Sequence, residues 1–223
     1  MTPINKTTGT PVENANEPAD RRSIDPSPDR PATPMTRTLI AYASVDGHTQ
    51  KVAERIAARI ESAGHAVDLV TADRLEHCRP ADYDGVVIGA PVRYGKHDAR
   101  IVRFLENNAA ALSARPNAFF SVNLVARNPD KRTVESNVHV RKFVDALDFS
   151  PDYIEIIAGK LDYPACRWLD RLLIRWIMKM TGGPTDPTTV IDYTDWDGVD
   201  RFAERMAERI GDHRAQATTQ SAG

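Results

Sequence analysis

The sequence has little cysteine and no long apolar run, and each shortage narrows the class of protein. Its two cysteines, Cys78 and Cys166, lie far apart and outside any CxxC or Cys/His spacing, which fits a reducing compartment and no metal site. The N-terminal segment lacks the apolar core of a secretory signal. A net charge of -2 and a pI of about 6.3 argue against a nucleic-acid partner.

Three nucleotide-related motifs are also missing. The segment Ser44 to Thr49 holds one glycine, so the GxGxxG of a dinucleotide fold is absent, and no GxxxxGK followed by Ser or Thr occurs. A phosphoacceptor receiver would end its third strand on an aspartate, where this chain has Gly89, Ala90 and Pro91.

The 223 residues divide by composition into two tails and one folded part. Residues 1–36 are rich in Pro, Asn, Thr, Asp and Arg and show no period, which predicts a disordered tail. We expect one folded domain over 37–211, with an insertion at about 161–192, and a frayed C-terminal tail over 212–223.

Within the folded part, short apolar runs alternate with stripes of helical spacing. This alternation predicts an α/β fold with a doubly wound, five-stranded parallel sheet, in which ligands bind at the carboxyl ends of the strands. The predicted strands are 38–43, 66–70, 85–89, 118–122 and 153–158. One helix is predicted to follow Gly47, and three more to contain Ile101 to Leu105, Val140 to Leu147 and Val199 to Ile210. The last of these is predicted to end at Gly211.

The loop after the first strand has the chemistry of a monophosphate cradle. Ser44 and Thr49 offer hydroxyl donors, Gly47 permits a positive φ, and the following helix supplies its positive N-terminal end. The loop contains no Lys or Arg, so the sequence predicts neutral donors; an ordinary helix N-cap turn is the structural alternative. The predicted phosphate contacts are Ser44, Val45, Asp46, Gly47, His48 and Thr49.

Two further carboxyl-end loops suit a planar heterocycle. The first has small residues that let a ring approach and an aromatic, Tyr94, that can stack on it, while Asn123 in the second offers an amide. The predicted contacts are Ala90, Pro91, Val92, Arg93, Tyr94 and Gly95, then Ser121, Val122, Asn123 and Leu124. A phosphate at one end and a flat ring at the other predict an FMN site.

These motifs resemble a known family. SVDGHT is similar to the phosphate loop of flavodoxins, although it keeps only the Gly-x-Thr part of their usual ending. GAPVRYGKH, SVNLVARNPDKRT, KMTGGPTD and YTDW resemble the flavodoxin-like, quinone-dependent protoporphyrinogen oxidases of bacterial haem synthesis. The resemblance covers about 37–211. It implies an FMN that takes hydride equivalents from protoporphyrinogen IX in successive two-electron steps and passes them to menaquinone or ubiquinone.

The insertion carries a helix with two unlike faces. Arg167, Arg171, Arg175 and Lys179 recur every four residues, and Trp168, Leu172 and Trp176 belong to the apolar arc beside them. The segment is too short and too charged to span a bilayer, so we expect it to lie on an anionic membrane surface or against respiratory-chain components. The expected location is the cytoplasmic face of the inner membrane; a helix packed on the sheet edge or a homo-oligomer contact is the alternative.

Substrate contacts are less defined by the sequence. Arg127, Lys131 and Arg132 follow the fourth strand and suit the two propionates of a porphyrinogen, or form a solvated loop. His48 and His97 lie in site loops, but no residue is assigned as a catalytic acid or base, since hydride acceptance belongs to a flavin. A soluble flavodoxin-type electron carrier, an NAD(P)H:quinone reductase and a membrane-tethered module with a degenerate flavin site remain as rival functions.

Overall fold

The structure is a computed structural model that describes residues 36–166 and 168–221. The predicted N-terminal tail therefore lies outside the described residues, except for Thr36. That residue is buried, and its main-chain oxygen accepts a hydrogen bond from the Ala66 N–H at 2.8 Å. Thr36 thus belongs to the folded part.

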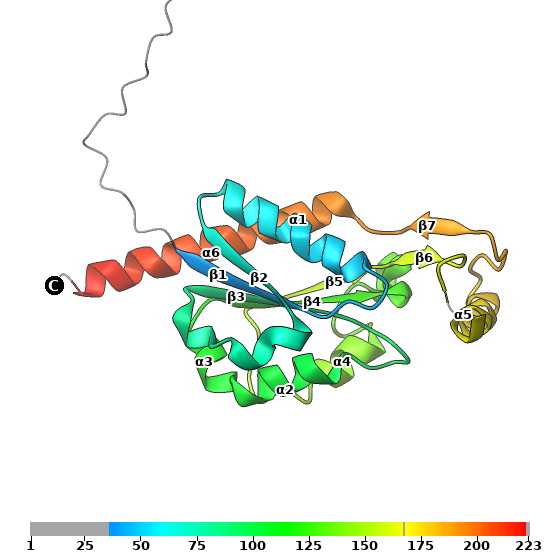
Figure 1. Ribbon diagram of the computed structural model, residues 1–223, viewed down its shortest axis with the longest axis horizontal. Helices are drawn as coiled ribbons and strands as arrows, with labels where there is room; N and C mark the ends of the chain where they lie inside the picture. The colour runs from blue at the N-terminus through cyan, green and yellow to red at the C-terminus, as the bar shows by residue number, and fades with distance from the viewer. Residues whose placement is uncertain (1–35, 167, 222–223) are drawn as a thin grey trace, which may run out of the picture. The chain divides into compact units, whose positions relative to one another are not determined.

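Five parallel strands form one sheet in the order β2-β1-β3-β4-β5 (Figure 1). The predicted α/β doubly wound sheet is confirmed. The strand order changes direction between β1 and β3, so their carboxyl ends flank the position where such sheets bind ligands. The strands are β1 Arg37–Tyr42, β2 Ala66–Thr71, β3 Gly85–Pro91, β4 Asn117–Asn123 and β5 Tyr153–Ala158.

The central strands are buried on both faces, because successive side chains point to opposite sides. In β1, Ile40 packs toward α1 (His48–Ser62) and α6 (Trp196–Ser221), whereas Leu39 packs toward the helices of the other face. Those helices are α2 Ala99–Asn107, α3 Ala109–Ser113 and α4 Val138–Val144 (Figure 1). Short 3-10 turns complete the connections: η1 Ala72–His77, η2 Pro80–Asp82, η3 Leu124–Arg127 and η4 Pro129–Lys131.

The last helix corrects the predicted C-terminal tail. We expected the helix to end at Gly211 and 212–223 to fray, but α6 continues to Ser221. Gly211 keeps a helical backbone, and Arg214 holds the extension by donating to the Asp84 carboxylate at 3.1 Å. The following residues include the helix formers Ala, Arg and Gln, so no residue there stops the helix.

The predicted insertion forms a small subassembly beyond the carboxyl end of β5. Strands β6 (Lys160–Asp162) and β7 (Val190–Asp192) pair antiparallel, and α5 (Trp168–Met180) lies between them in the sequence (Figure 1). Met178 of α5 is buried with Leu161 and Tyr163, and Leu124 from η3 packs against this cluster. The insertion therefore rests on the ligand-binding edge of the sheet.

Candidate functional site

The loop between β1 and α1 brings a helix N-terminus to the carboxyl edge of the sheet. Gly47 is the N-cap of α1 with a φ of 78°, a backbone conformation that favours glycine. Ser44 Oγ accepts from the Gln50 N–H at 3.4 Å, and among the described residues no acidic side chain lies in the first turn of α1. The positive end of the helix dipole thus faces the loop, and no carboxylate of that first turn neutralises it.

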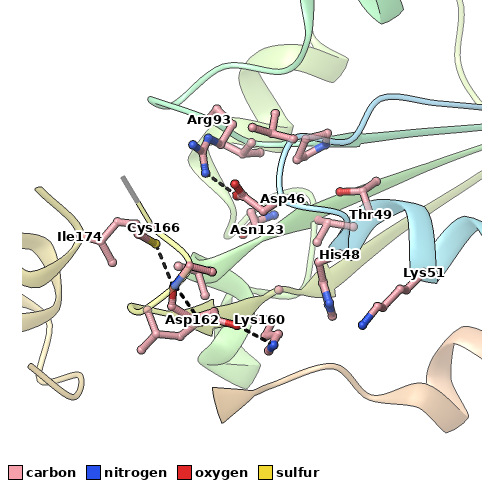
Figure 2. Close-up of a pocket in the computed structure, with 18 residues that line it drawn as sticks. Asp46, His48, Thr49, Lys51, Arg93, Asn123, Lys160, Asp162, Cys166 and Ile174 are labelled. Atoms are coloured by element: carbon pink, nitrogen blue, oxygen red, sulfur yellow. Dashed lines mark hydrogen bonds and ion pairs between the residues drawn. The ribbon is translucent and has the colours of Figure 1, made fainter. Parts of the chain in front are cut away.

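A cavity of about 150 Å³ opens beside this loop (Figure 2). Its wall combines the phosphate loop, the carboxyl ends of β3 and β4, and the insertion. It is lined by Val45, Asp46, His48, Thr49, Lys51, Pro91, Val92, Arg93, Val122, Asn123, Leu124, Gly159, Lys160, Leu161, Asp162, Ala165, Cys166 and Ile174. We call it the first cavity.

Two lysines that the loop sequence did not predict line the first cavity, together with Arg93 and the carboxylates of Asp46 and Asp162. Lys51 comes from the first turn of α1 and Lys160 from β6, and both line the cavity (Figure 2). The ammonium of Lys160 lies 2.7 Å from the Asp162 carboxylate, which fixes its side chain. The predicted set of purely neutral donors is therefore incomplete: the loop itself has no cation, but its surroundings supply two.

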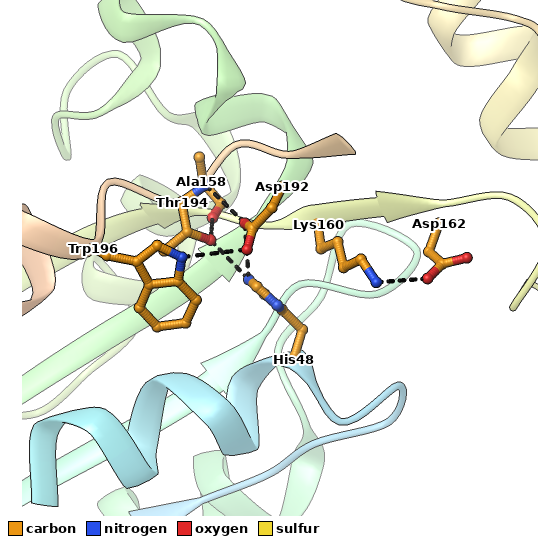
Figure 3. Close-up of polar contacts among 7 residues, drawn as sticks. All are labelled: His48, Ala158, Lys160, Asp162, Asp192, Thr194 and Trp196. Atoms are coloured by element: carbon orange, nitrogen blue, oxygen red, sulfur yellow. Dashed lines mark hydrogen bonds and ion pairs between the residues drawn. The ribbon is translucent and has the colours of Figure 1, made fainter. Parts of the chain in front are cut away.

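His48 is oriented by residues that follow β7 (Figure 3). Its Nε2 lies 2.8 Å from Thr194 Oγ1, which itself donates to the Ala158 carbonyl at 2.9 Å, and 3.8 Å from the Asp192 carboxylate. Burial lowers the pKa of His48, Asp192 opposes that shift, and the nearby lysines reinforce it. His48 thus enters the cavity wall with a lowered pKa, and its contact with Thr194 ties α1 to the segment that follows β7.

A second cavity of about 280 Å³ adjoins the first. The two share Val92, Arg93, Asn123, Leu124 and Ile174 in their walls, so their walls are continuous from the β1–α1 loop to α5, and we call the two cavities together the continuous space. The second cavity is lined by Val92, Arg93, Tyr94, Gly95, Asn123, Leu124, Val125, Arg127, His139, Asp170, Leu173, Ile174, Ile177 and Met178. Seven of these fourteen residues are Val, Leu, Ile or Met.

Arg93 joins the phosphate loop to the insertion. Its guanidinium donates to Asp46 at 2.6 Å and to Asp170 of α5 at 3.1 Å. The Tyr94 hydroxyl donates to the same Asp170, although the Tyr94 ring is 73% exposed and its φ is 50°. We call Asp46, Arg93, Tyr94 and Asp170 the Arg93 bridge; it holds three separate segments around one ligand space.

The loop after β4 is fixed by its own side chains. Asn123 Oδ1 accepts from the Ala126 N–H at 3.0 Å and from Asn137 Nδ2 at 3.2 Å, and Ser121 Oγ lies 2.9 Å from His97 Nε2. Asn123 therefore shapes the loop with the amide oxygen that we expected to face a ring. Of the sixteen predicted cofactor contacts, all line one of the two cavities except Ser44, Gly47, Ala90 and Ser121.

The three predicted substrate residues do not converge. Arg127 lines the second cavity, where its guanidinium donates to the Leu124 carbonyl at 3.2 Å and to Thr181 Oγ1 at 2.7 Å. Arg132 donates to the Ala126 carbonyl at 2.9 Å and lines a separate cleft along β5, while Lys131 pairs with the neighbouring Asp130 at 3.7 Å. Only Arg127 is placed to contact a ligand in the continuous space.

Helix α5 exposes its apolar residues and turns two arginines inward. Arg175 donates to the Thr185 carbonyl at 2.8 Å and Arg171 to the Cys166 carbonyl at 3.2 Å; the side chain of Arg167 lies outside the described residues. The exposed face consists of Trp168, Leu169, Leu172, Leu173, Trp176, Ile177 and Met180, with exposed fractions between 41% and 68%. We call it the α5 apolar face. Across 36–166 and 168–221, no helix is long and apolar enough to cross a membrane.

The fold and the site together define a flavodoxin-type flavoprotein. Residues 39–188 match the flavodoxin domain family, and the chain belongs to it. A solved flavodoxin, oxidised Flavodoxin 1 from Bacillus cereus, aligns with a TM-score of 0.48 and 13% identity, covering 78% of this chain and 98% of that one.

Two curated relatives narrow the family further. Protoporphyrinogen IX dehydrogenase (quinone) of Escherichia coli (strain K12) is 42% identical over 171 residues, which cover 77% of this chain and 94% of that protein. A protein of the same name from Leishmania major is 41% identical over 177 residues, covering 79% of this chain and 77% of its own length. The chain thus belongs to the family of quinone-dependent protoporphyrinogen IX dehydrogenases, and the resemblance of its motifs is confirmed.

Proposed function

We propose that this chain is an FMN-dependent enzyme that oxidises protoporphyrinogen IX to protoporphyrin IX and delivers the electrons to a membrane quinone. The observation that carries the proposal is the 42% identity across 94% of a relative whose name states this dehydrogenase activity. The two adjoining cavities support it, since one suits a phosphate and the other an apolar, planar group.

The residues present fit FMN rather than a flavin without a phosphate. The α1 N-terminus, with Gly47 at its N-cap, Ser44 and Thr49, would hold a phosphate, and Lys51 and Lys160 would balance its charge. Val92, Tyr94 and Leu124 would flank the ring in the second cavity. When bound, FMN supplies the capacity to accept a hydride equivalent from the porphyrinogen and to pass two electrons to a quinone.

The chain's own part in the reaction is to position the reactants and to exclude water. The Arg93 bridge holds Tyr94 against α5 in the wall of the second cavity. The Leu, Ile and Met side chains of α5 remove water from that space, which strengthens the remaining polar interactions there. Arg127 supplies positive charge at the rim toward a propionate.

The α5 apolar face supports peripheral attachment to a membrane. Trp168 and Trp176 are 68% and 61% exposed, and aromatic side chains of this kind settle in the headgroup layer. Lys179, which is also exposed, would meet anionic headgroups. Because Arg171 and Arg175 bind carbonyls of the insertion, the apolar residues contribute more of the attachment than the predicted basic stripe does.

The decisive experiment follows porphyrin fluorescence after protoporphyrinogen IX is added anaerobically to FMN-loaded protein, with and without menaquinone. Because this oxidation removes six electrons and each FMN accepts two, we expect porphyrin amounting to about one third of the bound flavin without quinone and continued turnover with it. A protein that retains FMN but forms no porphyrin would contradict the proposal. NAD(P)H oxidation and electron transfer to a partner protein would then test the reductase and carrier functions.

A further inference from the structure

The α5 side of the second cavity is both an inner wall and an outer surface. Leu173 and Ile177 line the cavity and are still 41% and 42% exposed, whereas Met178 lines it and is 1% exposed. A residue that belongs to both surfaces marks an opening. The second cavity therefore opens to the outside between apolar side chains of α5.

That opening is continuous with an apolar path along the helix. Leu169, Leu173, Trp176 and Met180 follow one another at spacings of three or four residues, so they lie along one side of α5, and all are exposed. A hydrocarbon chain emerging from the cavity would thus stay in contact with apolar side chains. A quinone with an isoprenoid tail has this chemistry: a flat, neutral head and a branched hydrocarbon chain.

The charges of the second cavity also favour a neutral ligand. Arg93 already binds two carboxylates, Asp46 and Asp170, and Arg127 is engaged by Leu124 and Thr181. The Asp170 carboxylate lies in the same wall as Leu173 and Ile177. A ligand with two propionates entering beside α5 would meet this negative charge. Among the arginines of the wall, only Arg127, whose partners are uncharged, is available to balance a propionate, whereas a neutral quinone needs no such partner.

A polar end is available for the quinone head. His139 also lines the cavity, and its ring lies so close to Gly95 that a Cβ there would approach Cε1 at 3.3 Å. Gly95, with a φ of 78°, therefore leaves room for the His139 ring. An imidazole N–H at this position suits a quinone carbonyl, which accepts hydrogen bonds.

We propose that an isoprenoid quinone binds on the α5 side of the second cavity, with its head toward His139 and its tail leaving between Leu173 and Ile177 along the α5 apolar face. The assignment rests on the proposed function, because it takes the quinone as electron acceptor.

The test compares two double variants. Leu173→Gln with Ile177→Gln makes the opening polar, while Leu69→Gln with Val190→Gln removes apolar surface from exposed positions outside both the cavity wall and the α5 apolar face. Each protein is loaded with FMN, reduced with dithionite and mixed anaerobically with menaquinone-1, and flavin reoxidation is followed by absorbance. Flavin reduction by protoporphyrinogen IX is measured separately, and menaquinone-1 binding to the oxidised proteins is measured by equilibrium dialysis.

For the 173/177 variant we expect the menaquinone-1 concentration for half-maximal reoxidation and the dissociation constant to rise about tenfold, with porphyrinogen reduction unchanged. The 69/190 variant is expected to match the wild type in all three measurements. Unchanged quinone binding in both variants, or slowed porphyrinogen reduction with normal reoxidation in the 173/177 variant, overturns the assignment; the second result makes the tetrapyrrole the occupant. Failure of porphyrinogen to reduce the wild type would refute the proposed function alone, because dithionite reduction still tests the quinone site.

Discussion

Arg93 donates to Asp170 at 3.1 Å, and this contact joins the loop after β3 to a helix of the insertion 77 residues later in the chain. Arg93 is also bound to Asp46 at 2.6 Å, so the phosphate loop and α5 are connected through one guanidinium. Asp170 is largely buried, and it accepts from Tyr94 as well. The position of α5 is thus coupled to the loops that surround the ligand space.

Replacing Asp170 by Asn should loosen α5 without removing side-chain volume. The substitution removes the charge that holds Arg93, and we expect the free energy of local opening of α5 to fall by about 1 kcal/mol, since Arg93 is partly exposed. Hydrogen exchange of α5 amides checks this. The control is Asp68→Asn, which breaks the exposed Arg37–Asp68 pair at the far edge of the sheet. Equal exchange in wild type and Asp170→Asn would show that the Arg93 bridge does not hold the helix.

The phosphate cradle gives a second prediction. Ser44→Ala combined with Thr49→Val removes two hydroxyls beside the α1 N-terminus, and FMN affinity should fall about 10- to 100-fold. The affinity for riboflavin, which has no phosphate, should fall much less. Fluorescence titration of apoprotein with each flavin measures the difference. Ser62→Ala, at the opposite end of the same helix, serves as control. If the affinities for FMN and riboflavin fall equally, the two hydroxyls do not bind the phosphate.

The α5 apolar face gives a third prediction. Trp168→Ser with Trp176→Ser should reduce binding to vesicles of phosphatidylglycerol and phosphatidylcholine about tenfold or more while FMN content stays constant. Co-sedimentation measures it. Leu69→Ser, which removes a partly exposed apolar side chain from β2, is the matched control. If the Trp variant sediments with vesicles like the wild type but changes its mass in solution, the face is a contact between copies of the chain.

The sheet and the phosphate loop were predictable because their signals are local. In a run such as Gly85 to Gly89, successive residues face opposite sides of the sheet and none is polar, which indicates a strand buried on both faces. The five predicted strands match the observed ones to within two residues at each end. Gly47 between a strand and a helical stripe marks a positive φ, which the structure has at 78°. Gly64, the residue after the C-cap Ala63 of α1, has a φ of 93°, the left-handed conformation that commonly ends a helix.

The arrangement around the cavities was not predictable from such signals. Lys160 and Asp170 enter the site from an insertion whose path depends on tertiary packing of Leu161, Tyr163 and Met178. Helical spacing placed Arg171 and Arg175 on one face but did not tell which face packs inward. The insertion's loops leave carbonyls of Cys166 and Thr185 that need donors, and the long arginine side chains satisfy them.

A buried histidine behind the site predicts how stability depends on pH. His97 packs against Phe143 at a centroid distance of 4.4 Å and lies 2.9 Å from Ser121 Oγ. Burial, followed by the nearby His139, lowers the pKa of His97 to about 4. In the unfolded chain its pKa is about 6.5, so between these values the unfolded state binds the proton more readily than the folded state.

The contribution of His97 to stability is therefore fully present above about pH 6.5 and is lost as pH falls toward 4, by about 3 kcal/mol in total. His97→Gln keeps a hydrogen-bonding group toward Ser121 but does not titrate, so its free energy of unfolding should fall less steeply across that window. Urea unfolding at a series of pH values measures both slopes. The exposed His77→Gln should show the same pH dependence of the free energy of unfolding as the wild type. If His97→Gln shows that same dependence too, protonation of His97 does not destabilise the folded state.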